Sequence, residues 1–104
     1  MRRGEVWWAE QPEPVSRRPV VLLSRDEAYE VRNAVTVAQV TRTIRDIPVE
    51  VPLDTRDGLP QRCVLNLDTI TTIRKAILTE RICSLGSAKI DEINKAIKFA
   101  LQLD

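Results

Sequence analysis

The chain has no histidine, only two cysteines, and few aromatic residues (two tryptophans, one tyrosine and one phenylalanine) among 104 residues. Cys63 and Cys83 lie far apart without a CxxC pair, and no histidine can complete a zinc tetrahedron, so we expect neither a metal nor another cofactor. Both cysteines sit among apolar residues and are expected to be buried free thiols. Long apolar segments and a signal-peptide pattern are also lacking, which predicts a cytoplasmic protein without membrane association.

The chain also lacks an excess of one charge, because it contains sixteen basic and fifteen acidic residues. Binding to nucleic acid would therefore depend on local clusters of charge. All ten cationic residues up to Arg62 are arginines, whereas the four lysines lie between Lys75 and Lys98. The planar guanidinium of arginine matches phosphate better than a lysine ammonium does. This preference for arginine over lysine fits either a phosphate-binding surface or a genome composition that favours arginine codons, and both interpretations stay open here.

Short apolar runs separated by turn residues fill the first four fifths of the chain, a pattern typical of β-strands. A short helix is predicted over residues 26–33, and a C-terminal helix follows Gly86, with Ser87 as its N-cap and an apolar stripe that includes Ile90, Ile93 and Ile97. The predicted strands are Glu5–Ala9, Pro19–Ser24, Val35–Thr41, Pro48–Leu53, Cys63–Leu67 and a short one at Ile82–Leu85.

Five or six strands and one amphipathic helix predict a mainly β fold with α, in one domain over residues 1–104: a small, strongly curved antiparallel sheet or open barrel with the helix packed on it. Such a fold has a groove where its loops gather. Because strands adjacent in sequence usually pair, Arg18 and Thr41 are expected to come close. Five arginines fall at the ends of the second and third strands: Arg17, Arg18, Arg25, Arg42 and Arg45.

Six segments occur in a recognisable order: RGEVWWA, RRPVVLLSRD, VTVAQVT, VEVPL, GLPQRCVLNLDTI and LTERICSLGSAKIDEINKAIKFAL. Together they resemble the MazF/PemK (Kid) family of toxin endoribonucleases. No single segment is specific, but the colinear set covers nearly the whole chain. The resemblance implies an SH3-like barrel of the CcdB/MazF/PemK type that forms a homodimer. It also implies metal-independent cleavage of single-stranded RNA (mRNA, tRNA or rRNA) and inhibition by a cognate MazE-like antitoxin.

By motif position, the resemblance implies that Arg18 and Thr41 are the catalytic residues. RNA carries its own nucleophile, because the ribose 2'-OH can attack the adjacent phosphorus and leave a 2',3'-cyclic phosphate and a 5'-OH. The protein must then hold the attack in line and stabilise the charge that builds on the phosphoryl oxygens. Arg18 suits the second task, and Thr41 can orient the same phosphate. The RNA-binding residues expected around them are Arg17, Arg25, Gln39, Arg42, Arg45, Asn66 and Asp68.

Each of these assignments has a structural alternative. Arg18 could form a salt bridge with Glu10 or Glu13, and Thr41 could be an ordinary strand residue. Two other functions also remain open: a CcdB-like toxin that poisons a topoisomerase, and a nucleic-acid-binding barrel without catalytic activity.

Several positions depart from the usual family pattern. The first connection, EQPEPVSR, has two prolines and no glycine, which indicates a shorter and stiffer lid over the RNA groove. Asn66 stands where some members carry a catalytic arginine, which leaves Asp68 to orient Arg18 or to read a base edge. Thr71 and Arg74 replace residues common in relatives, so dimer or antitoxin contacts are expected to differ.

The scarce aromatic residues limit how RNA bases could be stacked. Consecutive strand residues face opposite sides, so only one of Trp7 and Trp8 can enter the core. The other is free to stack a base or to join an interface, although packing is the simpler interpretation for both. Phe99 flanks the apolar stripe of the C-terminal helix and is expected at the core edge or in an antitoxin contact.

Overall fold

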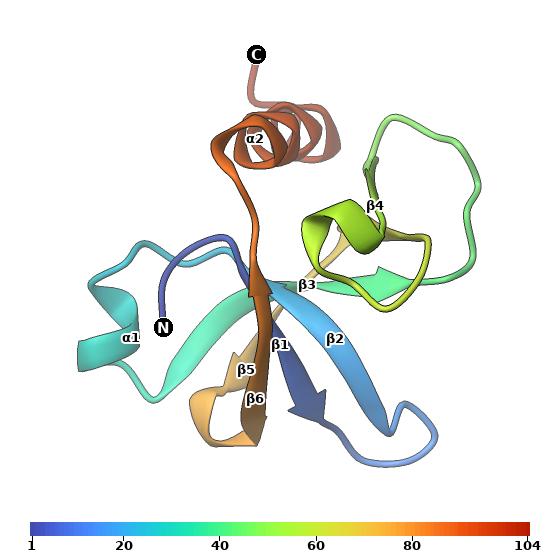
Figure 1. Ribbon diagram of the computed structural model, residues 1–104. Helices are drawn as coiled ribbons and strands as arrows, with labels where there is room; N and C mark the ends of the chain where they lie inside the picture. Colours follow the sequence, from blue (N-terminus) through green and yellow to red (C-terminus); the bar gives the residue numbers. More distant parts are fainter.

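The computed structural model describes residues 1–104 and contains one six-stranded sheet in the order β4-β5-β3-β2-β1-β6, with every neighbouring pair antiparallel (Figure 1). The sheet curves strongly, and the long helix α2 lies across one end of it (Figure 1). The predicted fold class is thus confirmed. The elements are β1 (Glu5–Glu10), β2 (Arg17–Leu22), α1 (Ala28–Val31), β3 (Ala34–Thr41), β4 (Glu50–Leu53), η1 (Thr55–Asp57), β5 (Cys63–Arg74), η2 (Lys75–Ile77), β6 (Leu78–Ser84) and α2 (Ser87–Leu101).

Apolar side chains cover both faces of the central strands. On β2, Val21 packs into the larger core beneath α2, whereas Val20 and Leu22 pack into a second core on the opposite face, around Tyr29. This explains why β2 is a continuous apolar run rather than an alternating one. Each of these side chains is fully buried and stabilises the fold by about 1.5–3 kcal/mol. Central β2 and its neighbour β3 therefore form a rigid base for the residues at their ends.

Strand β2 begins two residues earlier than predicted, at Arg17, because Glu10 and Ala9 of β1 pair with Arg17 and Arg18. Arg18 is thus a strand residue whose backbone is held by a neighbouring strand. The strand also ends earlier, at Leu22, and the predicted helix over 26–33 is reduced to Ala28–Val31. Only the helix is shorter, since β2 keeps six residues and is shifted by two; between the two elements the chain bends at Ser24 and turns at Asp26 and Glu27.

The last two strands are longer than predicted. Strand β5 continues beyond Leu67 to Arg74, and its second half, TITTIR, pairs with the start of β3 after a shift in register. Strand β6 begins at Leu78 and forms the sheet edge against β1. These segments carry few large core residues, so their strand conformation depends on pairing that local sequence does not reveal.

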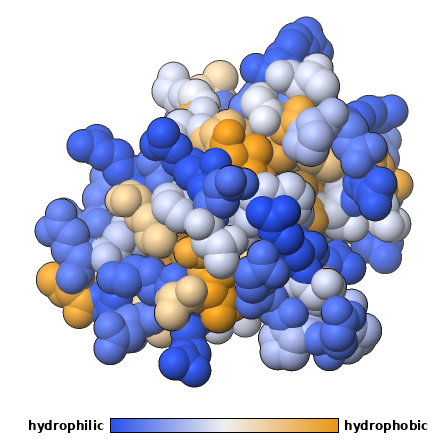
Figure 2. All heavy atoms as spheres, turned by 60° about the horizontal axis from the view of Figure 1, so that its bottom comes forward, coloured by the Kyte–Doolittle hydropathy of each residue, from blue (hydrophilic) through white to orange (hydrophobic).

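Helix α2 buries Ile93 and Ala96 against the sheet. Its N-cap is Gly86 rather than Ser87, which is the first helical residue, and no side chain caps the helix. Phe99 is 63% exposed and belongs to neither core, so the core-edge alternative is wrong, and an antitoxin contact stays a prediction. Neither this helix nor α1 is long and apolar enough to cross a membrane. On the face shown in Figure 2, the exposed apolar side chains form separate patches between hydrophilic side chains.

Candidate active site

A cavity of about 510 Å³ opens where β2 begins and β3 ends. Three arginines line it, Arg17 and Arg18 from β2 and Arg42 just after β3, and no acidic side chain is among the lining residues. The cavity is therefore electropositive. An anionic ligand such as a phosphodiester suits these walls.

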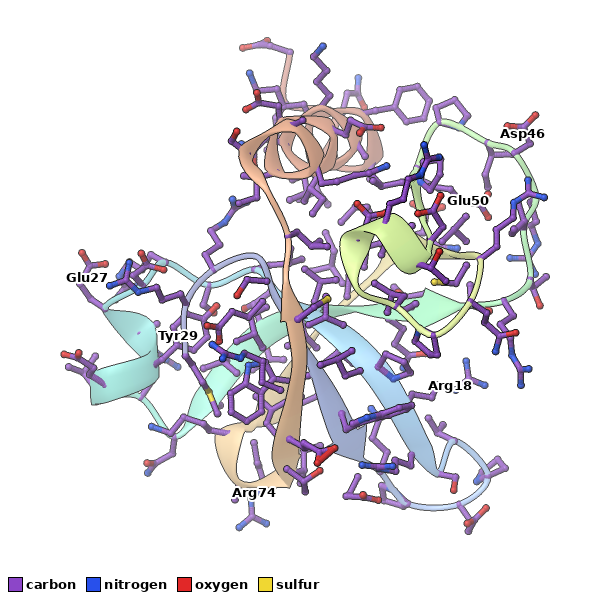
Figure 3. All side chains as sticks on the ribbon, in the orientation of Figure 1. Arg18, Glu27, Tyr29, Asp46, Glu50 and Arg74 are labelled. Carbon is purple, nitrogen blue, oxygen red and sulfur yellow. The ribbon has the colours of Figure 1, made fainter.

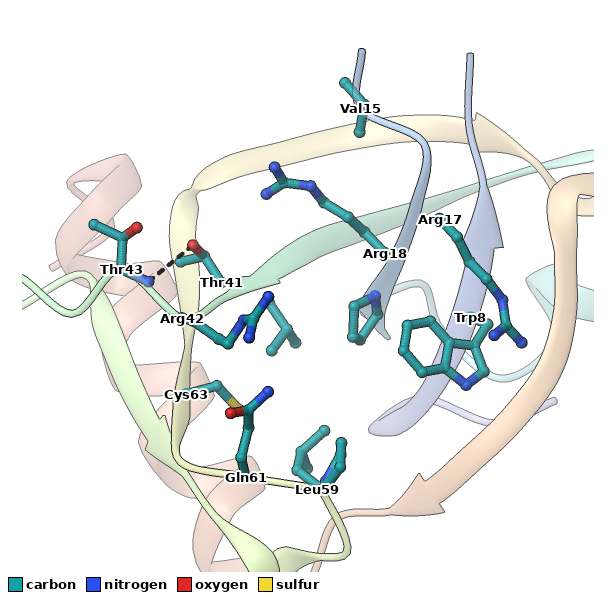
Figure 4. A pocket seen from close by; sticks show the side chains of 13 residues that line it. Trp8, Val15, Arg17, Arg18, Thr41, Arg42, Thr43, Leu59, Gln61 and Cys63 are labelled. Atoms are coloured by element: carbon teal, nitrogen blue, oxygen red, sulfur yellow. Dashed lines mark hydrogen bonds between the residues drawn. The ribbon is translucent and has the colours of Figure 1, made fainter. Parts of the chain in front are cut away.

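Arg18 and Thr41 both line this cavity. Strands β2 and β3 pair antiparallel with Val20 opposite Gln39, and continuing that register by two residues places Arg18 opposite Thr41. Because residues two apart on a strand share a face, the two side chains project to the same side of the sheet. Figure 4 shows them on the same side of the cavity. The sequence expectation that they come together agrees with this arrangement.

The two neighbouring arginines differ in what they contact. Arg17 Nε lies 3.0 Å from Glu10 Oε1, and its Nη2 lies 3.6 Å from Glu80 Oε1. Its guanidinium also stacks over the Trp8 ring, 4.2 Å from the centroid (Figure 4). Arg18 forms no ion pair or hydrogen bond through its side chain within the chain. The salt bridge considered for Arg18 is therefore made by Arg17, because alternation along β2 turns the two side chains to opposite faces.

Thr41 has a hydroxyl group that is held in place but still able to donate. Its Oγ1 accepts a hydrogen bond from the backbone N–H of Thr43 at 3.2 Å (Figure 4). A hydroxyl carries one proton in addition to its acceptor lone pairs, so the Thr41 proton stays free for a ligand. Arg18 and Thr41 thus both present hydrogen-bond donors at the same cavity.

Comparison with known proteins identifies the family of this chain. Residues 2–101 match the family described as PemK-like, MazF-like toxin of type II toxin-antitoxin system. The chain belongs to this family. The protein named probable endoribonuclease MazF5 of Mycobacterium tuberculosis is 40% identical over 100 residues, covering 95% of this chain and 91% of that protein.

Solved structures of family members have the same fold. The Mycobacterium tuberculosis toxin MazF-mt6 superposes with a TM-score of 0.89 at 32% identity, covering 96% of this chain and 98% of that one. A mycobacterial endoribonuclease solved in complex with its cognate antitoxin superposes with a TM-score of 0.88 at 27% identity, covering 100% and 97%. The family resemblance derived from the sequence is confirmed.

In this PemK/MazF-family chain, the connection between β4 and β5 forms a further wall of the cavity through Leu59, Pro60 and Gln61. The turn is built by Asp54, whose side chain accepts from Arg56 N, and by Gly58, whose φ of 103° few other residues adopt. The sequence pattern Asp-Gly-Leu-Pro indicates a turn here, but nothing in it shows that the turn faces Arg18. Gln61 is thus a cavity residue that sequence reasoning missed.

The two tryptophans face opposite sides, as strand alternation predicts. Trp7 packs against the second core and donates its Nε1–H to Glu5 at 2.9 Å. Trp8 lines the cavity beneath Arg17. Glu5 is buried, and although burial by itself raises its pKa, hydrogen bonds from Trp7, Arg2 and Arg81 lower it below the usual value.

The other expected RNA-binding residues lie outside this cavity, apart from Arg17 and Arg42. Arg25 lies between the end of β2 and the start of α1. Figure 3 shows Tyr29 of α1 on the opposite side of the molecule from Arg18. Arg45 is in the β3–β4 connection, where its backbone N–H donates to Glu50. Gln39, Asn66 and Asp68 lie where β3 and β5 pair. Asp68 is exposed and forms no ion pair with Arg18.

Both cysteines are free, Cys63 buried at the cavity wall and Cys83 half-buried. Burial and nearby acidic groups raise the pKa of both thiols above the ordinary value. The neutral thiol is therefore favoured and the thiolate nucleophile disfavoured. No group of three or more histidine, cysteine, aspartate or glutamate side chains is placed to hold a metal ion.

Proposed function

We propose that this chain, acting as a single toxin domain over residues 1–104, is a sequence-selective endoribonuclease that cleaves single-stranded RNA. The observation that carries the proposal is the unpaired Arg18 guanidinium beside the Thr41 hydroxyl in a cavity lined by arginines and free of acidic groups. Relatives named as endoribonucleases, at up to 40% identity, support it. The intact chain would inhibit translation and growth by cutting mRNA, tRNA or rRNA.

The reaction that this site suits uses the RNA's own 2'-OH. As its oxygen bonds to the adjacent phosphorus, the bond to the 5'-oxygen breaks. The 2'-OH proton passes to water and the departing 5'-oxygen takes a proton from water, leaving a 2',3'-cyclic phosphate and a 5'-OH. Arg18 stabilises the negative charge on the phosphoryl oxygens, and Thr41 donates to the same phosphate and orients it for in-line attack. A guanidinium presents hydrogen-bond donors and no acceptor, so we assign Arg18 to charge stabilisation rather than to proton abstraction. No step needs a metal ion.

The proposal includes partners and location. One solved relative is an endoribonuclease in complex with its cognate antitoxin, and we expect a MazE-like antitoxin to block the arginine-lined cavity of this chain. An acidic segment that orders on binding suits such a surface. We also expect a homodimer in the cytoplasm, bound to no membrane.

The test incubates the purified chain with a long single-stranded RNA in EDTA and maps the new 5' ends. We expect discrete cuts with 5'-OH ends, and at least about a hundredfold loss of cutting in Arg18→Ala, the scale seen when one transition-state donor is removed. Arg32→Ala is the matched control, because Arg32 is exposed and bonds only the backbone of Ala34. It should cut like the wild type.

Three results would contradict the proposal. Intact RNA with inhibited DNA supercoiling would favour the topoisomerase poison, and RNA bound but uncut would favour a binding barrel. Cutting that persists in a folded Arg18→Ala variant would remove Arg18 from the active site.

A further inference from the structure

A row of polar side chains lies beside the catalytic pair on the same face of the sheet. Gln39 of β3 is opposite Asn66 of β5, and Asn66 is opposite Glu50 of β4. Gln39 is two residues from Thr41, so both project to one face, about 7 Å apart along the strand. The face that carries Arg18 and Thr41 therefore continues into amide groups.

Asn66 has an amide of fixed polarity. The residue is only 8% exposed, and its Oδ1 accepts a hydrogen bond from the backbone N–H of Asp68 at 2.8 Å. That bond requires the oxygen at this position and turns Nδ2 the other way. Nδ2 forms no hydrogen bond within the chain. It is nevertheless accessible to solvent, because Gln11 Oε1 is the only fully buried polar side-chain atom that lacks a hydrogen-bond partner. Two N–H donors are thus held ready for a ligand.

Gln39 is fixed by its backbone and free at its side chain. Its backbone N–H donates to Thr69 Oγ1 at 3.0 Å, and the Thr69 hydroxyl donates to the carbonyl of Asn66 at 2.6 Å. Thr69 thereby ties β3 to β5 where their register shifts. The half-buried side-chain amide of Gln39 makes no hydrogen bond in the chain.

Glu50, the third member of the row, is already engaged. Its carboxylate accepts hydrogen bonds from the backbone N–H groups of Arg45 and Asp46, at 3.0 and 2.8 Å, and so holds the β3–β4 connection. The groups left for a ligand are the amides of Gln39 and Asn66. Cross-strand neighbours have Cβ atoms about 4.5–5.5 Å apart, close enough for both amides to reach one planar base.

We propose that Asn66, with Gln39 beside it, reads the base of a nucleotide adjoining the scissile phosphate by donating to a carbonyl oxygen of that base. The inference rests on the proposed function. Uracil, guanine and cytosine carry such an oxygen. Adenine has none, and its amino group would face the N–H donors of Asn66. The side-chain amide of Gln39 can rotate to donate or accept a hydrogen bond. The selection against adenine therefore comes from the fixed amide of Asn66.

The test uses an RNA pool with a randomised segment, cut in EDTA and sequenced at the new ends. For the wild type we expect one position adjoining the cut where adenine is disfavoured by about tenfold or more. Asn66→Asp keeps the acceptor for Asp68 and replaces the donors with an acceptor. It should abolish or reverse that preference while leaving the other positions unchanged. Asn33→Asp makes the same change at an exposed site and should leave the preference intact.

Asn66→Asp adds a charge opposite Glu50, so its folding is checked by thermal melting. Gln39→Glu, at a half-exposed side chain with no partner in the chain, provides the second variant and should alter preference at the same position. The inference is overturned if adenine is accepted at both positions adjoining the wild-type cut. It is equally overturned if the folded variants keep the wild-type preference, or lose cutting evenly at all sequences. If the wild type leaves the RNA uncut, the proposed function is overturned as well. The other outcomes overturn only the assignment of base reading to Asn66 and Gln39, so the two failures can be told apart.

Discussion

The Arg17 guanidinium lies 4.2 Å from the centroid of the Trp8 ring and is paired with Glu10, whereas Arg18, one residue further along β2, has no partner. Two adjacent residues of the same type thus have different surroundings, because a strand sends them to opposite faces. One arginine is held by the protein, and the other remains available to a phosphate.

We expect Arg17→Ala to lower kcat/KM for RNA cleavage by less than about tenfold, because the charge of Arg17 is already balanced by Glu10 and Glu80. The free energy of unfolding should fall by about 1 kcal/mol, because the substitution removes an exposed ion pair and a cation–π contact. Cleavage kinetics and urea unfolding measure the two effects. A loss as large as that in Arg18→Ala would show that Arg17 also acts on the scissile phosphate.

Thr41→Val removes the hydroxyl and keeps the shape of the side chain. Loss of a hydrogen bond to a charged phosphate costs about 1.5–3 kcal/mol, so single-turnover cleavage should slow by roughly 10- to 150-fold. Thr41→Ser retains the hydroxyl and should stay within a few fold of the wild type. Equal rates for the valine and serine variants would assign Thr41 to strand packing only.

Gly58→Ala should destabilise the chain by about 1–3 kcal/mol, since φ is 103° and an added Cβ would lie 2.6 Å from Cys83 Cβ. Gly86→Ala is the control, with ordinary φ and no atom within 4 Å of the new Cβ, and should cost less than about 1 kcal/mol. Urea unfolding gives both values. Similar values for the two variants would contradict the steric argument at Gly58.

Tyr29 makes stability depend on alkaline pH. Burial, with the nearby Asp26, raises the pKa of its hydroxyl from 10.0 to about 12. The neutral form is favoured in the folded state, so the stabilisation is complete below pH 10 and is lost as pH rises toward 12. Tyr29→Phe loses the hydrogen bond to Ser24, about 1 kcal/mol at neutral pH, and should show a smaller decline over that interval. Parallel declines in urea unfolding from pH 9 to 12 would refute this assignment.

Much of the fold follows from local patterns. The apolar run after Arg18, the alternation of β3 and the stripe of α2 are visible in the sequence, because a buried strand, a half-buried strand and an amphipathic helix each have their own period. The second half of β5 and the start of β6 were missed because most of their residues are exposed or half-exposed and owe their conformation to the strands beside them.

For the site, residue types and order in the sequence indicated Arg18 and Thr41, and strand adjacency predicted their approach. The sequence could not show that Glu10 pairs with Arg17 instead of Arg18, that Gln61 faces the cavity, or that the Asn66 amide is oriented by Asp68. Periodicity and composition are properties of neighbours along the chain, and they determine which segments become strands or helices. Which side chains meet across strands depends on twist and register, including the register shift between β3 and β5, and only the assembled sheet decides these.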